Sequence, residues 1–161
     1  VSPRAVPGFG EHLVVLDSDE HTPDGHITED LAVRIQMVDK RMRKNAGLKA
    51  DIIPPSVTGD EKPHVLLACW GSTLGPALEA AETLRQGGTS AAVMHFGQVW
   101  PLDPGHFLPV LESAGRTVMV EGNHSAQLAG IIRQETGYAF SSTVTRYDGL
   151  PLSAAYILER L

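Results

Sequence analysis

The chain has 161 residues, a formal net charge of −6 and a hydrophobic share of 42%, which is sufficient for one domain and part of another. The acidic balance argues against nucleic-acid binding, because no basic patch is available to neutralise phosphates. No apolar run approaches the roughly 20 residues that span a bilayer, and the single cysteine, Cys69, excludes an internal disulfide and an iron–sulfur cluster held by this chain alone.

The first residues do not resemble a targeting signal. The chain begins at Val1 and opens with VSPRAVPG, which lacks the basic and apolar regions of a signal peptide. This start predicts that the sequence lies inside a larger protein. The single cysteine favours a reducing, cytoplasmic location.

Residues 1–48 predict a strand, a loop and a helix. The apolar run HLVVL at 12–16 is typical of a strand, and the segment 17–30, rich in Asp, Pro and Gly, is typical of a loop. Thr28 is the expected N-cap of the helix. The helix is expected to end at Gly47, after basic residues at 40–44. Its apolar residues recur at spacings of four, three and four and form one stripe: Leu31, Ile35, Val38 and Met42.

Residues 49–63 are the expected linker. The sequence KADIIPPSVTGDEKP contains three prolines, one glycine and five charged side chains. This composition predicts an absence of regular structure. We therefore expect the end of one domain at 1–48 and a second domain at 64–161.

Residues 64–161 alternate between strand and helix patterns. Strands are predicted at 64–70, 91–96, 116–121 and 143–147, each followed by a helix that ends at a glycine, at an alanine–glycine pair or at the chain end. The continuous apolar run HVLLACW is typical of a strand that is buried on both faces of a parallel sheet. The pattern predicts a three-layer α/β/α fold with a mostly parallel sheet, preceded by the strand–loop–helix segment.

The turn GSTLG at 71–75 is the first candidate site. It follows a strand and opens a helix, where main-chain N–H groups can bind an anion. Its letters match neither the dinucleotide nor the phosphate-loop nor the nucleophile-elbow pattern. Gly71, Ser72 and Thr73 are therefore candidates for a position near a ligand or an interface, and an ordinary tight turn with a helix cap is the alternative.

The segment EGNHSAQ at 121–127 occupies the corresponding place after the third strand of this domain. Glu121, Asn123 and His124 are polar groups at the same edge of the predicted sheet, and Glu121 or His124 could act in acid–base chemistry. The alternative is helix capping by Asn123 or Ser125 with an exposed imidazole.

The loop at 17–30 combines carboxylates with two imidazoles. These groups suit metal ions, but their spacing matches no metal motif, so we predict no metal site. The basic residues at 40–44 would lie about 20 Å away along the helix, so the carboxylates are expected to need positive or hydrogen-bonding groups from elsewhere. We expect His21, Asp24 and His26 to contact another domain or subunit.

Several longer segments resemble the alpha subunit of 2-oxoacid:ferredoxin oxidoreductases, and the 2-oxoglutarate type most closely. SPRAVPG, VVLDSDEHTPDGHITED and RIQMVDKRMRK resemble the end of its pyrimidine-binding domain. The segments that resemble the following domain, which is similar in fold to the C-terminal domain of transketolase, are CWGSTLGPALEA, HFGQVWPLDP, VEGNHSAQLAGIIRQETG and RYDGLPLS. The linker at 49–63 shows no clear match.

The resemblance implies a holoenzyme that binds thiamine diphosphate and Mg²⁺ between this subunit and a beta subunit. That enzyme decarboxylates a 2-oxoacid oxidatively, gives the acyl group to coenzyme A and passes electrons through iron–sulfur clusters to ferredoxin. The family's substrate and cofactor contacts would lie before Val1. The resemblance therefore implies no catalytic residue in this chain and no cofactor bound by it alone. It implies a role in assembly with the beta subunit and the rest of the alpha subunit.

Two other readings stay open on the residues alone. One is an autonomous anion- or nucleotide-binding module that uses the turns at 71–75 and 121–127. The other is a purely structural interaction domain.

Overall fold

The computed structural model describes residues 5–11, 14 and 19–161. The predicted strand at 12–16 therefore lies outside the described residues, apart from Val14. Contacts divide the chain into two units, Val1–Asp51 and Ile52–Leu161, and the division falls inside the predicted linker.

The N-cap of the helix in the first unit lies two residues later than expected. Helix α1 spans Leu31–Leu48, and a short 3₁₀ helix follows at Lys49–Asp51. The N-cap is Asp30, whose Oδ1 accepts hydrogen bonds from the main-chain N–H groups of the second and third helical residues at 2.7 and 3.2 Å. The prediction of Thr28 as the cap is wrong, because its hydroxyl instead accepts from the N–H of Asp30 at 3.1 Å.

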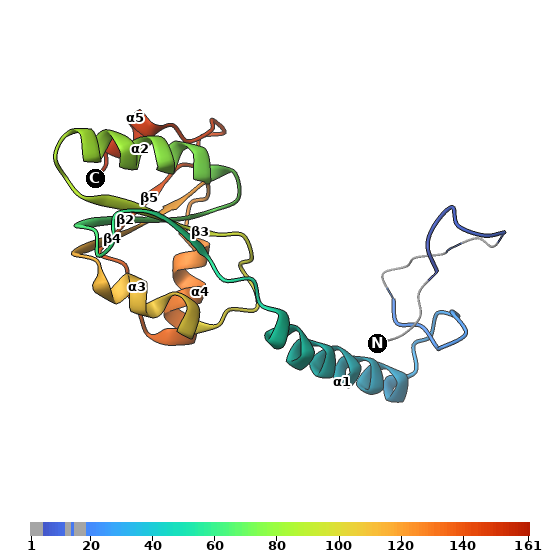
Figure 1. Cartoon of the computed structure of the whole chain (residues 1–161). Coiled ribbons are helices and arrows are strands. Elements are labelled where there is room, and N and C mark those ends of the chain that lie inside the picture. Colours follow the sequence, from blue (N-terminus) through green and yellow to red (C-terminus); the bar gives the residue numbers. More distant parts are fainter. Residues whose placement is uncertain (1–4, 12–13, 15–18) are drawn as a thin grey trace. The chain divides into compact units, whose positions relative to one another are not determined.

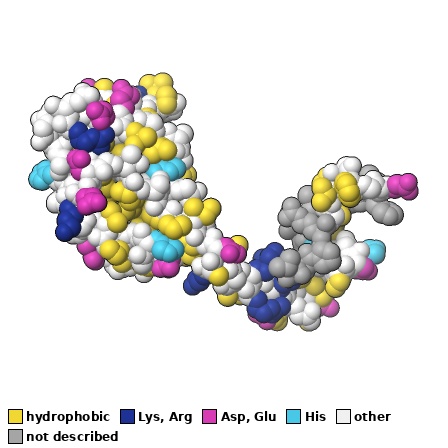
Figure 2. Space-filling view, in the orientation of Figure 1, with side chains coloured by type: hydrophobic (Ala, Val, Ile, Leu, Met, Phe, Trp, Pro, Cys, Tyr) yellow, Lys and Arg dark blue, Asp and Glu magenta, His cyan; other side chains and the backbone are white. Residues whose placement is uncertain are grey.

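The apolar stripe of α1 is uncovered in the described residues. The helix contains no buried residue, and three stripe members are exposed by 60% or more: Leu31, Ile35 and Met42. Figure 2 shows hydrophobic side chains exposed in this first unit. Helices in water draw most of their stability from packing of such a face, so this stripe is a surface that suits a covering partner.

The second unit is built on one five-stranded sheet. The strands are β1 at Ser56–Gly59, β2 at Val65–Trp70, β3 at Ala91–Phe96, β4 at Arg116–Glu121 and β5 at Ser142–Thr145. Their order is β1-β3-β2-β4-β5, and all neighbours pair in parallel except β1 and β3, which are antiparallel. The predicted, mostly parallel sheet is confirmed.

Strand β1 corrects the expectation that residues 49–63 lack regular structure. Val57 and Thr58 favour strand conformation, and a terminal strand tolerates the prolines that precede it. The Asp60 carboxylate accepts a hydrogen bond from Ala91 N at 2.9 Å, which fixes the end of β1 beside β3. Gly59 has φ +121°, and a Cβ at this position would lie 2.6 Å from Ala91 O, so the pairing needs glycine there.

Two helices cover each face of the sheet (Figure 1). On one face, α2 at Leu74–Gln86 and α5 at Ala154–Leu158 pack over Leu67 and Cys69 of β2. On the other face, α3 at Leu108–Ser113 and α4 at Gln127–Thr136 pack over Leu66 and Ala68. Alternate residues of one strand thus feed two cores, which is the reason that β2 is apolar throughout and that the predicted three layers form.

In the second unit, the boundaries of α4 and α5 also differ from the predicted ones. Helix α4 begins at Gln127 rather than Ser125, because Ala126 adopts a left-handed conformation with φ +50°. Helix α5 is capped by Ser153 and ends at Leu158, three residues before the chain end at which the pattern predicts its end. Within the described residues, no helix is long and apolar enough to cross a membrane.

The connections reverse direction between β2 and β4. The chain leaves β2 through α2 toward β3 on one side, and leaves β4 through α4 toward β5 on the other side. In open α/β sheets, ligands gather at the carboxyl ends of strands at such a reversal. Both candidate turns, at 71–75 and 121–127, lie at this place.

Candidate functional site at the carboxyl ends of β2 and β4

Glu121 is the centre of the hydrogen-bond network at the reversal. This last residue of β4 is fully buried. Its Oε2 accepts from Trp70 Nε1 at 3.1 Å, from Asn123 Nδ2 at 2.7 Å and from Leu128 N at 3.1 Å, and its Oε1 accepts from Ala129 N at 3.0 Å. The carboxylate is thus stabilised by four donors, two of them free N–H groups of the first turn of α4.

The geometry favours capping over acid–base chemistry at this segment. The Glu121 carboxylate occupies the main-chain donors that an incoming anion would need, and Asn123 Oδ1 accepts from Gln127 N at 3.2 Å. Of the two caps weighed from the sequence, Asn123 is the one that contacts the helix. The sequence analysis did not predict the hydrogen bond between Trp70 and Glu121. Its signal was an indole N–H and a carboxylate at the ends of two predicted strands.

The hydroxyl of Thr73 stabilises the turn after β2. Thr73 Oγ1 donates to Trp70 O at 2.6 Å and accepts from Trp70 N at 3.2 Å. Gly71 has φ +59°, and its carbonyl accepts from His95 Nε2 at 3.3 Å. Ser72 is exposed. A 3₁₀ turn at Gly71–Thr73 therefore precedes α2.

His124 lies apart from the Glu121 network. Its exposed imidazole packs edge-on against Tyr147, with 4.6 Å between the ring centroids and 68° between the ring planes. The structure thus brings together Glu121 and Asn123 and places Gly71–Thr73 beside them through Trp70. The role of these residues near a ligand or an interface stays a prediction.

The loop of the first unit folds back on itself as a small hairpin. His21 forms a bridge with Ile27, and Thr22 N donates to His26 O at 2.9 Å. The Asp24 carboxylate accepts from the hydroxyl of Thr22 and contacts His26 Nδ1 at 2.8 Å. The hydrogen bonds from Thr22 and then from His26 lower the pKa of Asp24 to about 2.

The expectation that this loop has no nearby positive group is wrong. Glu20 pairs with Arg41, whose Nη1 lies 3.1 Å from Oε2, and with Arg34, whose Nη1 lies 2.8 Å from Oε1. The two arginines are seven residues apart and therefore share one face of α1. The hairpin makes the approach possible, because Thr28 N donates to Glu20 O at 3.0 Å and so returns the chain to Glu20 before α1 begins.

This ion pair changes the electrostatics of the loop. The hydrogen bonds from Arg41 and then from Arg34 lower the pKa of Glu20 to about 2. Within residues 5–11, 14 and 19–161, no group of three or more His, Cys, Asp or Glu side chains is arranged to hold a metal ion.

The thiol of Cys69 is buried in the core of the second unit. Burial raises its pKa to about 11, which a hydrogen bond with Thr73 only partly offsets. A thiol in this state is a poor nucleophile and a poor metal ligand.

The fold agrees with comparisons to known proteins. The family described as "Transketolase, C-terminal domain" matches residues 57–148, which is more than half of the chain. The chain belongs to this family. The match begins inside β1 and ends just after β5, so the family's shared region is the five-stranded sheet with the helices between its strands.

Longer matches extend over both units. Subunit alpha of 2-oxoacid:ferredoxin oxidoreductase 1 from Aeropyrum pernix is 35% identical over 161 residues, which cover 97% of this chain and 25% of that subunit. A solved 2-oxoglutarate:ferredoxin oxidoreductase from Magnetococcus marinus, with 2-oxoglutarate, coenzyme A and succinyl-CoA bound, aligns with a TM-score of 0.70 and 26% identity over 99% of this chain and 28% of that one. The chain thus spans about a quarter of the length of the curated relatives that it matches.

A further likeness concerns the fold alone. A split-gene transketolase in an inactive beta4 tetramer aligns with a TM-score of 0.53 and 23% identity over 67% of this chain and 40% of that one.

Proposed function

We propose that this chain is the non-catalytic, C-terminal part of the alpha subunit of a 2-oxoacid:ferredoxin oxidoreductase of the 2-oxoglutarate type. The observation that carries the proposal is the match along nearly the whole chain, both to an alpha subunit in sequence and to a 2-oxoglutarate enzyme in structure. The enzyme would decarboxylate its 2-oxoacid oxidatively, form an acyl-CoA and pass electrons to ferredoxin.

The chemistry of the described residues supports a non-catalytic role. Glu121 is fully engaged as a cap, and Cys69 is buried and protonated at neutral pH. One cysteine does not fit an iron–sulfur cluster, and the described residues offer no ligand set for Mg²⁺. Thiamine diphosphate, Mg²⁺ and the clusters are therefore assigned to other parts of the holoenzyme. The reduced state that we expect for Cys69 favours the cytoplasm as the location.

The first unit supports a role in assembly. An 18-residue helix with an exposed apolar stripe needs a covering surface. We assign that surface to the rest of the alpha subunit, and the hairpin with His21, Asp24 and His26 to a contact with the beta subunit. The division into 1–48, 49–63 and 64–161 stays part of this proposal.

The activity test uses the full-length subunit purified with its beta subunit. Reduction of ferredoxin should require 2-oxoglutarate, coenzyme A and thiamine diphosphate together, and pyruvate in place of 2-oxoglutarate tests the substrate class. A cluster-loaded complex that reduces ferredoxin with no 2-oxoacid would contradict the proposal. Calorimetry on the 161-residue chain with thiamine diphosphate and Mg²⁺ should show no micromolar binding.

The assembly test replaces both imidazoles of the hairpin in the full subunit. We expect H21A/H26A to weaken co-purification of the beta subunit at unchanged metal content. His106→Ala, an exposed histidine of the second unit, is the matched control and should leave assembly unchanged. Loss of a stoichiometric metal from H21A/H26A would instead favour a metal site in the hairpin.

The alternative function, an anion- or nucleotide-binding module, is weakened at one of its two turns. The Glu121 carboxylate already fills the N-terminal donors of α4. The turn at 71–75 has no such internal occupant among the described residues, so phosphate and nucleotide screening by thermal shift tests that turn alone.

A further inference from the structure

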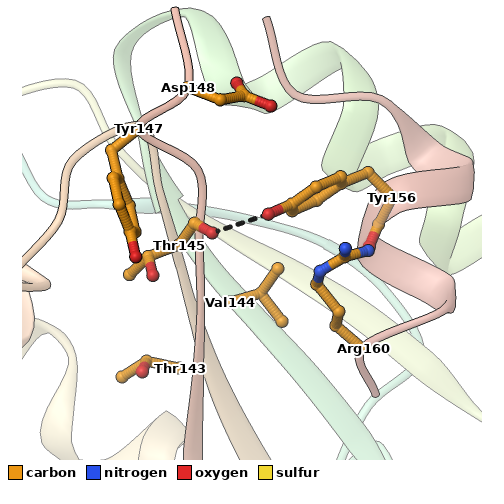
Figure 3. A pocket seen from close by; sticks show the side chains of 7 residues that line it. All are labelled: Thr143, Val144, Thr145, Tyr147, Asp148, Tyr156 and Arg160. Atoms are coloured by element: carbon orange, nitrogen blue, oxygen red, sulfur yellow. Dashed lines mark hydrogen bonds between the residues drawn. The ribbon is translucent and has the colours of Figure 1, made fainter. Parts of the chain in front are cut away.

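A pocket outside the candidate site lies beside the terminal strand β5. Its volume is about 470 Å³, which is within the usual range for small-molecule sites. Figure 3 shows Tyr147 with two threonines on one side of β5, and Tyr156 with Arg160 on the other. The lining residues are Thr143, Val144, Thr145, Tyr147, Asp148, Tyr156 and Arg160.

The main chain of β5 contributes hydrogen-bond donors to this pocket. Arg146 N donates to Glu121 O at 3.0 Å, so the residues of β5 with even numbers direct their main-chain groups toward β4. In a parallel pair the alternate residues face the other way, so Thr143 and Thr145 direct their N–H groups to the open edge. The carbonyl of Thr145 also faces this edge, but Tyr156 OH donates to it at 3.1 Å and so occupies this acceptor.

The side chains add further donors. The hydroxyls of Thr143, Thr145 and Tyr147 also line the pocket, and each can donate a hydrogen bond. The Arg160 guanidinium is held in place, because its Cζ lies 3.5 Å from the centroid of the Tyr156 ring and its Nη1 donates to Tyr156 O at 3.2 Å. A cation that is already ordered loses little entropy when it binds an anion.

The acidic groups near the pocket are paired. Asp148 accepts from Arg146 Nε at 2.9 and 3.2 Å, and this pairing lowers the pKa of Asp148. Arg146 also donates to Pro151 O at 2.7 Å, which keeps the pair fixed. Glu159 contacts Arg160 at 3.2 Å with a side chain that is 72% exposed, so a ligand can replace it at little cost.

We propose that this pocket binds a small organic anion, whose carboxylate or phosphate group pairs with Arg160 and whose further polar groups reach across the edge of β5 to the hydroxyls of Thr143, Thr145 and Tyr147. The positive charge of Arg160, fixed against the Tyr156 ring, selects an anion rather than a cation. The volume exceeds what an inorganic ion fills, so the ligand extends beyond its acid group. The site is independent of the proposed enzyme activity.

The test follows the amide NMR spectrum of the 161-residue chain during titration. The probes are glutarate for a carboxylate and AMP for a phosphate monoester, with neutral glutaramide and adenosine as their counterparts. We expect saturable shifts confined to residues 142–148 and 154–161 with at least one anion, and weaker shifts with its neutral counterpart. The anion that binds identifies which of the two acid groups the pocket takes.

Variants assign the effect to the pocket. R160Q should weaken binding by about tenfold or more, and R160K by less, because it keeps the charge but loses the planar fork. R133Q, on the exposed side of α4, removes the same charge elsewhere and should change nothing. T143V, on an exposed side chain, should weaken binding about threefold and serves if R160Q does not fold.

Three results would overturn the proposal. The first is an absence of shifts with both anions at ~10 mM, which corresponds to affinity too weak for a specific site. The second is equal binding of an anion and its neutral counterpart. The third is unchanged affinity in folded R160Q, or in T143V where R160Q is unfolded.

Discussion

Replacing Glu121 by Gln should destabilise the second unit through one atom. The change keeps the shape of the side chain but converts one carboxylate oxygen into an NH₂ group. In the less costly orientation the remaining oxygen keeps the three donors at Oε2, and the new NH₂ faces Ala129 N, which donates to Oε1 at 3.0 Å in the native protein. One buried N–H then loses its acceptor, and three bonds lose their charge assistance.

The magnitude follows from these two losses. A buried donor without a partner costs about 1–3 kcal/mol, and hydrogen bonds to a charged acceptor are stronger than neutral ones. We therefore expect E121Q to lower the free energy of unfolding by about 2–4 kcal/mol, which corresponds to a fall in the melting temperature of roughly 10 °C. E121A, which removes all four bonds and leaves a cavity, should cost more.

Urea unfolding of the 161-residue chain, followed by circular dichroism, measures this loss. Glu135→Gln is the matched control, because it makes the same change at an exposed position of α4 and should stay within about 0.5 kcal/mol of the native chain. Trp70→Phe removes one donor and should cost less than E121Q. If E121Q unfolds within the range of the control, the carboxylate does not hold the two turns together and the reasoning fails.

Three further predictions concern other parts of the chain. The ion pair of Glu20 with Arg41 should be complete above about pH 4.5 and be lost as the pH falls toward about 2, because the folded state lowers the pKa of Glu20. Side-chain NMR signals of Arg41 that do not change between these pH values would contradict this prediction. Cys69, with a pKa of about 11, should react with iodoacetamide at pH 8 only after urea is added, so rapid labelling of the native chain would count against its burial. Gly59→Ala should lower stability by about 1–3 kcal/mol in thermal unfolding, because the backbone has a positive φ there and the added Cβ would clash with Ala91 O. Gly75→Ala should not lower it, because no atom lies within 4 Å of the added Cβ.

The sequence predicted the elements whose signals are local. Strands β2 and β3 were predicted to within a residue, because each is a continuous apolar run bounded by Gly or polar residues. Strand β1 was missed, because its four exposed residues carry no apolar periodicity and it forms only by pairing with β3. Composition describes what a segment prefers alone, and here a tertiary contact decided the outcome.

In the candidate site, too, the sequence predicted the positions of residues along the chain but not their tertiary contacts. The sequence placed Glu121 and Trp70 at the ends of neighbouring strands but could not say whether the carboxylate faces water or a helix. The answer depends on the start of α4, where Ala126 turns the chain so that two main-chain N–H groups point at Glu121. The contact of Glu20 with Arg41 was missed for a related reason, because it depends on a hairpin that composition alone does not reveal.

Because β1 belongs to the sheet of the second unit, only a short segment joins the two units. The 3₁₀ helix of the first unit ends at Asp51 and β1 begins at Ser56, so four residues join them, and two of these are prolines. Such a segment reaches at most about 14 Å, and its prolines restrict it further. A partner that binds one unit therefore raises the effective concentration of the other at its own surface, so contacts of the two units with one partner reinforce each other.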